Sequence, residues 1–151
     1  MSQGMVVRGK AYGGRAIPVV LALGGLMYSL VGAALLLAPA WFHETIGRFP
    51  PFNRHYLGDL GAFHLPLGVG LLVAACDPSR YRGIIGVAAA TSLLHVANHL
   101  YDAAGARMPA DQWLFQVPVL GVAAVALTAC YLGITRSGFR ARPDVGNAPM
   151  S

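Results

Sequence analysis

The stretch IPVVLALGGLMYSLVGAALLLAPA, from Ile17 to Ala40, contains no charged residue. A helix that spans a bilayer needs about 20 consecutive apolar residues, and this run is long enough. Its last three residues, Ala38 to Ala40, fit a signal-peptidase cleavage pattern, but the apolar core of a signal peptide has only about 7 to 15 residues. The stretch therefore predicts a retained membrane-spanning helix.

The composition of the whole chain supports this prediction. Of its 151 residues, 56% are hydrophobic and only 11% are charged, whereas a soluble domain has about 25% charged residues. A single small domain of this composition needs the lipid bilayer as its partner. The net charge of +5 comes from basic residues in the short segments between apolar runs, so it indicates membrane orientation and not nucleic-acid binding.

Three further apolar segments have the length of a membrane span, and helices are expected because a bilayer leaves no other open-ended way to pair the backbone. The predicted fold class is an all-α polytopic membrane four-helix bundle, in which many glycines and alanines allow close helix approach. The predicted parts are an N-terminal segment 1–16, a transmembrane domain 17–136 with spans at 17–40, 57–76, 83–104 and 113–135, and a disordered tail 137–151.

The distribution of basic residues predicts the orientation. With four spans, both termini and the 77–82 turn lie on one side, which carries eight of the eleven Lys and Arg residues. By the positive-inside rule this side is cytoplasmic, so we expect an N-in/C-in protein of the plasma (cytoplasmic) membrane. Cys76 and Cys130 have no CxxC spacing and are expected near the cytoplasmic face, where thiols stay reduced.

Titratable side chains gather at the ends of the second and third spans that lie away from the predicted cytoplasmic side. In HVANHLYD, residues 95–102, the side chains of His95, His99 and Asp102 share one helical face within roughly 60°. In RHYLGD, residues 54–59, His55 and Asp59 lie about 40° apart. The two spans are antiparallel across a short turn, so Asp59 is expected level with His99, and His55 with Asp102.

His64 is predicted to lie at nearly the same depth as His95, within roughly 3 Å along the axis. On an ideal helix its side chain points about 140° away from that of Asp59. His64 is therefore the weakest member of the predicted cluster.

Two histidines at positions i and i+4, facing carboxylates on a second helix, form a workable site for a first-row transition metal such as Zn, Cu or Fe. The leading hypothesis is a metal-binding, redox-associated membrane subunit, because ionisable residues inside a membrane are functional by default. The predicted ligands are His95, His99, Asp59 and His55, with Asp102 as a ligand or as the hydrogen-bond partner of one, and His64 as a weaker candidate.

Two alternatives remain open. The polar cluster could instead be structural, joining helices in a non-catalytic partner or assembly subunit of a membrane complex or homo-oligomer. A haem held by His64 and His95 from facing helices is the less favoured alternative. The chain contains no GxSxG, Walker A or HExxH pattern, so no catalytic residue is assigned.

The motifs NRHYLGDLGAFHLPLGVGLL and HVANHLYD resemble those of a group of small four-helix membrane proteins common in actinobacteria. The resemblance rests on Asn53, His55, Asp59 and Gly61, and on the pair His95 and His99. It implies the four-span topology, and the group has no assigned activity. More loosely, the size and topology are similar to those of DoxX-like membrane proteins, some of which are associated with quinone-linked redox work.

Overall fold

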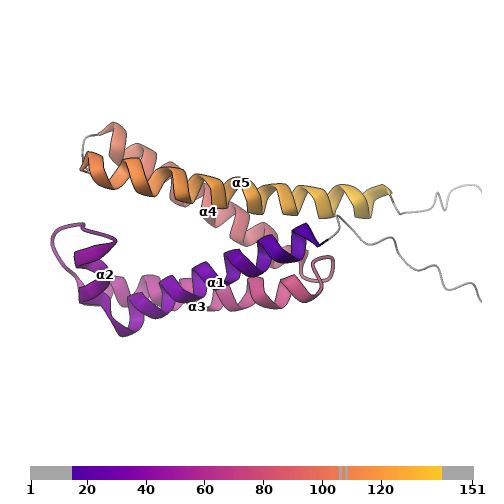
Figure 1. The fold of residues 1–151 in the computed structure, drawn as a ribbon, viewed down its shortest axis with the longest axis horizontal. Coiled ribbons are helices and arrows are strands. Elements are labelled where there is room, and N and C mark those ends of the chain that lie inside the picture. The colour runs from indigo at the N-terminus through magenta and orange to yellow at the C-terminus, as the bar shows by residue number, and fades with distance from the viewer. Residues whose placement is uncertain (1–14, 106, 108, 141–151) are drawn as a thin grey trace, which may run out of the picture.

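Five α-helices make up the computed structural model, which describes residues 15–105, 107 and 109–140, with 137–140 as backbone only. They are α1 (Ala16–Leu37), α2 (Pro39–Thr45), α3 (Arg54–Cys76), α4 (Arg82–Ala104) and α5 (Ala110–Arg140) (Figure 1). The described residues contain no strand. All but α2 are long and apolar enough to cross a membrane, which confirms the predicted all-α fold with four spans.

Proline sets the end of the first long helix. Pro39 disfavours a helical conformation at the residue before it, and Ala38 has φ −137° and ψ 54°. The helix therefore ends at Leu37, three residues before the predicted end of the span, and Pro39 begins α2, where its missing N–H does no harm. At the other end of the chain, α5 continues through residues 137–140 of the predicted tail, and residues 141–151 lie outside the described residues.

Two short polar side chains fix the ends of α3. The side chain of Asn53 accepts a hydrogen bond from the backbone N–H of Tyr56 at 3.1 Å and caps the helix N-terminus. The carboxylate of Asp77 accepts one from the backbone N–H of Arg80, also at 3.1 Å, and stabilises the turn into α4.

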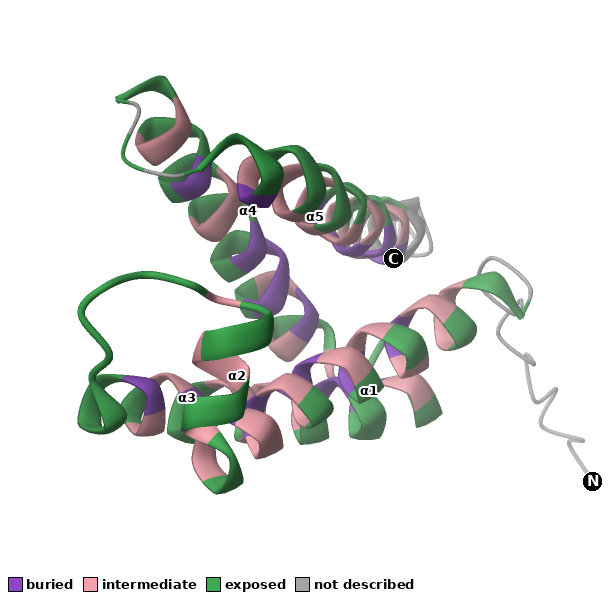
Figure 2. Ribbon diagram, turned by 60° about the vertical axis from the view of Figure 1, so that its left-hand side comes forward, coloured by how far each residue is buried: buried purple, intermediate pink, exposed green. Residues whose placement is uncertain are grey.

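One end of the bundle contains residue 15, the 77–81 turn and residue 136, and is called here the termini side. The four long helices meet in one core near this end. One fully buried side chain comes from each helix: Leu21, Leu71, Ile85 and Leu127. Toward the opposite end, called the loop side and containing residues 38–53, 105 and 109, the helices separate into two pairs. Figures 1 and 2 show α1 beside α3, α4 beside α5, and the two pairs diverging as a V.

The α1–α3 pair is held by backbone contact at glycines. A Cβ atom added to Gly25 would lie 2.8 Å from the carbonyl oxygen of Gly68, and one added to Gly61 would lie 2.8 Å from that of Gly32. Within each helix the two glycines are seven residues apart, about two turns, so they share one face. Such faces let membrane helices approach closely and gain van der Waals contact.

We expect Gly68→Ala to destabilise the protein by about 1–3 kcal/mol, the usual penalty for overpacking. Its Cβ would meet backbone atoms, including the carbonyl oxygen of Gly25 at 2.7 Å, and backbone cannot move aside cheaply. The matched control is Gly58→Ala in the same helix, where no atom lies within 4 Å of the added Cβ. Thermal unfolding in detergent, followed by circular dichroism, measures both; equal melting temperatures would contradict the proposed glycine contact.

Candidate functional site

A hydrogen bond between two buried hydroxyls joins the arms of the V. The Oη atom of Tyr28 on α1 lies 2.7 Å from the Oγ atom of Ser92 on α4. Ser92 donates its own proton to the carbonyl oxygen of Ala88 at 2.8 Å, so Tyr28 is the donor to Ser92. The phenol therefore connects the α1–α3 pair with the α4–α5 pair in the apolar interior.

His64 on α3 lies beside this bond. Its ring stacks on that of Tyr28, with centroids 5.5 Å apart and an interplanar angle of 30°. Its Nδ1 atom lies 2.8 Å from the carbonyl oxygen of Leu60. Because a carbonyl only accepts, Nδ1 carries the proton, and the Nε2 atom of the neutral ring has a free lone pair.

The rings of His95 and His99 face each other across one turn of α4. Their Nε2 atoms are 3.0 Å apart and their centroids 4.8 Å apart. His99 is 7% exposed, and its Nδ1 atom has no hydrogen-bond partner among the described residues. The centroid of the His64 ring lies 6.3 Å from that of His95, so three imidazoles lie in sequence between α3 and α4.

His55 and Asp59 are placed elsewhere. The Nε2 atom of His55 lies 3.5 Å from the Oδ2 atom of Asp59, and their side chains are 89% and 61% exposed. They form a pair of their own on α3, because α3 packs on α1 and diverges from α4 toward the loop side (Figure 2). The sequence predicted that Asp59 would lie beside His99 because the two residues are at equal depth on antiparallel helices. In the structure, equal depth does not bring them together.

The predicted ligand set is therefore only partly brought together. His95, His99 and His64 are neighbours, and Asp102 follows His99 by three residues, about one turn later on α4. Within the described part of the chain, no group of three or more His, Cys, Asp and Glu side chains is arranged to hold a metal ion. The pair His95 and His99 is the part of the predicted site that has ligand-like geometry.

The loop at residues 46–53 bridges the open end of the V next to His99. Arg48 makes an ion pair with Asp111 at 2.6 Å. Gln112 donates to the carbonyl oxygen of Arg48 at 3.3 Å, and Gln116 donates to that of Ile46 at 2.7 Å. These bonds join the loop to the start of α5, and the ring of Phe49 lies 6.3 Å from that of His99.

The geometry of the histidine pair allows two chemistries. Two ring nitrogens bound to one tetrahedral metal ion are separated by about 3.3 Å, since each Zn–N bond is about 2.0–2.1 Å. A separation of 3.0 Å also suits a hydrogen bond in which one imidazole donates and the other accepts. It suits haem poorly, because the Nε2 atom of His95 has another imidazole against it where an iron atom would bind.

Tyr28 and Ser92 were not predicted as members of the cluster. Ser92 appears in the sequence as an ordinary packing residue of an apolar helix, and Tyr28 as one aromatic residue in an uncharged span. The available signal was depth: a phenol far from both interfaces has no water to bind, so it needs a partner inside the protein.

No protein-family model, curated protein or solved structure matches this chain. The function is therefore argued from the geometry of the cluster.

The Tyr28–Ser92 hydrogen bond should appear as an energetic coupling between α1 and α4. In a double-mutant cycle of Tyr28→Phe and Ser92→Ala, we expect a coupling of about 0.6 kcal/mol, and not above about 1.7 kcal/mol, the range for hydrogen bonds within membrane proteins. Unfolding by denaturant in mixed micelles measures it. Pairing Tyr28→Phe with Thr128→Ala is the control, because Thr128 bonds only within α5; equal coupling in both cycles would argue against the bond.

Proposed function

We propose that this chain is a small integral membrane protein that binds a first-row transition-metal ion at His95 and His99. The observation that supports the proposal is the 3.0 Å separation of their Nε2 atoms on one helix. A helix fixes the two ring nitrogens on the same side, and imidazole nitrogen suits zinc, copper and iron.

His64 is the natural third ligand in this proposal. Its hydrogen bond to Leu60 leaves the Nε2 lone pair free, and such a bond through Nδ1 is typical of histidines that bind metals. Two imidazoles on one ion have ring centroids about 5–6 Å apart by the usual bond lengths, close to the 6.3 Å between His64 and His95. To act as a ligand, the His64 side chain would rotate toward His95, and the remaining position would stay open for water or an exchangeable ligand.

Metal binding is tested with zinc and copper ions added to the purified protein in detergent. We expect about one ion per chain at pH 7.5, and at least about tenfold weaker binding in His95→Ala and in His99→Ala, since each removes a ligand. Binding should weaken as the pH falls, because imidazole must lose its proton to bind metal.

The matched control is His55→Ala, which removes an exposed histidine of α3 and should leave the affinity unchanged. Elemental analysis and competition with a chromophoric chelator give stoichiometry and affinity. Absence of bound metal in the wild-type protein, or equal loss in His55→Ala, would contradict the proposal.

A second candidate function is favoured by the Tyr28–Ser92 bond and by the stacking of His64 on Tyr28. These contacts join α1, α3 and α4, as expected of a partner or assembly subunit whose polar cluster is structural. On this alternative, His99→Ala lowers the melting temperature while no metal is bound at any stage. The metal titration therefore separates the two functions.

For the orientation, we propose cytoplasmic termini in the plasma membrane, on the strength of the basic residues of the termini side. Cys76 lies at this side and is exposed, whereas Cys130 is buried. In intact spheroplasts a membrane-impermeant maleimide should not label Cys76, and it should do so once the membrane is opened. As a control, Arg107→Cys in a Cys76→Ser background should be labelled from outside; the reverse pattern would invert the proposed topology.

A further inference from the structure

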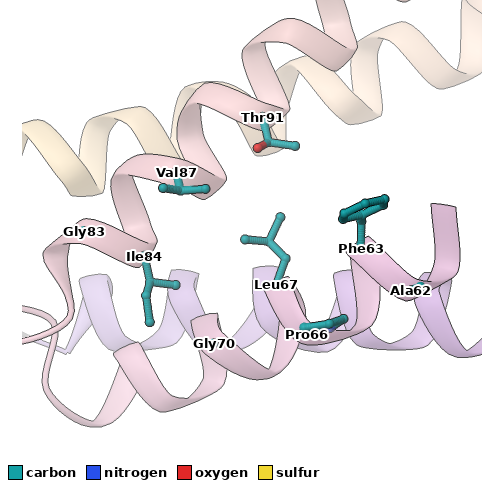
Figure 3. A pocket seen from close by; sticks show the side chains of 9 residues that line it. All are labelled: Ala62, Phe63, Pro66, Leu67, Gly70, Gly83, Ile84, Val87 and Thr91. Carbon is teal, nitrogen blue, oxygen red and sulfur yellow. The ribbon is translucent and has the colours of Figure 1, made fainter. Parts of the chain in front are cut away.

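An apolar cleft of about 800 Å³ lies between α3 and α4 and extends from the level of His64 toward the 77–81 turn (Figure 3). Its volume is within the range of about 300–1,000 Å³ that is typical of ligand sites. Nine residues line it: Ala62, Phe63, Pro66, Leu67, Gly70, Gly83, Ile84, Val87 and Thr91. The cleft exists because α3 is held against α1, so that α3 and α4 diverge from the 77–81 turn.

Thr91 is the one hydroxyl in this lining, and its side chain points into the cleft (Figure 3). The hydroxyls of Thr128 and Thr135 donate to carbonyl oxygens four residues earlier in their helix, at 2.7 and 3.0 Å. The hydroxyl of Thr91 makes no hydrogen bond to any residue that the structure describes. Thr91 is exposed at the cleft, so its hydroxyl is free to form a hydrogen bond with an oxygen atom of a ligand.

Depth and charge select the kind of ligand. Thr91 is nine residues after the start of α4, so it lies about 13 Å along the helix, far inside a span about 30 Å thick. A phospholipid keeps its charged head group at the surface and cannot present it at this depth. No charged side chain is among the nine residues of the lining, which favours an uncharged occupant.

We propose that the α3–α4 cleft binds an uncharged lipid, such as a long-chain alcohol, whose oxygen atom forms a hydrogen bond with the hydroxyl of Thr91. Its hydrocarbon chain lies against Phe63, Leu67 and Val87, which project into the cleft (Figure 3). The site uses none of the proposed metal ligands and stands independently of metal binding.

The test uses a hexadecanol analogue with a photoreactive diazirine in its chain, added to the protein in nanodiscs. We expect cross-links concentrated on the lining residues of α3 and α4, displaced by hexadecanol and only weakly by hexadecane. Thr91→Val should weaken binding about fivefold, the effect of one hydrogen bond of about 1 kcal/mol. Val87→Trp, which fills the cleft, should reduce specific labelling at least tenfold.

The matched control is Val122→Trp on α5, outside the cleft; the two valines are 60% and 71% exposed. It should leave the labelling unchanged. Labelling spread evenly over the lipid-facing surfaces, or cross-links between two chains through the cleft, would overturn the proposal. Val87→Trp is expected to keep bound metal and His99→Ala to keep lipid labelling, so failure of one site is distinguishable from failure of the other.

Discussion

The backbone contact between α1 and α3 determines the rest of the arrangement. Gly25 and Gly68 let the two helices approach until carbonyl oxygens lie where side chains would otherwise be. In a bilayer, where apolar side chains gain little by leaving lipid, such close packing is a main source of helix association. Because α3 packs along the length of α1, it diverges from α4, although only the 77–81 turn separates α3 from α4 in the sequence. The V shape, the apolar cleft and the position of Tyr28 between the pairs follow from the packing of α3 on α1.

The polar residues inside the V are explained by the same constraint. Two helix pairs that meet only near the termini side need further contacts to hold the loop side together. The Tyr28–Ser92 bond supplies one in the apolar interior, where an unpaired phenol or hydroxyl would be unfavourable. The three imidazoles continue this line toward the loop side. Stabilising the bundle and presenting ligand nitrogens are therefore compatible roles for one cluster.

Much of the fold could be predicted from the sequence, because length and apolarity alone identify the four spans. The helix end before Pro39 could also have been predicted, although the predicted first span extended to residue 40. Pairing between helices was not predictable from depth. Asp59 was expected beside His99 since both are equally far from the turn, but depth says nothing about the direction in which α3 leans. His64 was undervalued for the same reason: its direction was judged against Asp59, whereas the site lies on the side that faces Tyr28 and His95.

The 46–53 loop lies beside His99 at the loop side. The Arg48–Asp111 pair is exposed, and exposed ion pairs contribute only about 0–1 kcal/mol. The bonds from Gln112 and Gln116 to loop carbonyls add to it, and Gln112 is buried. Phe49 is thereby held next to His99. These contacts are made by polar side chains, whereas at the glycine contact between α1 and α3 backbone packs directly on backbone.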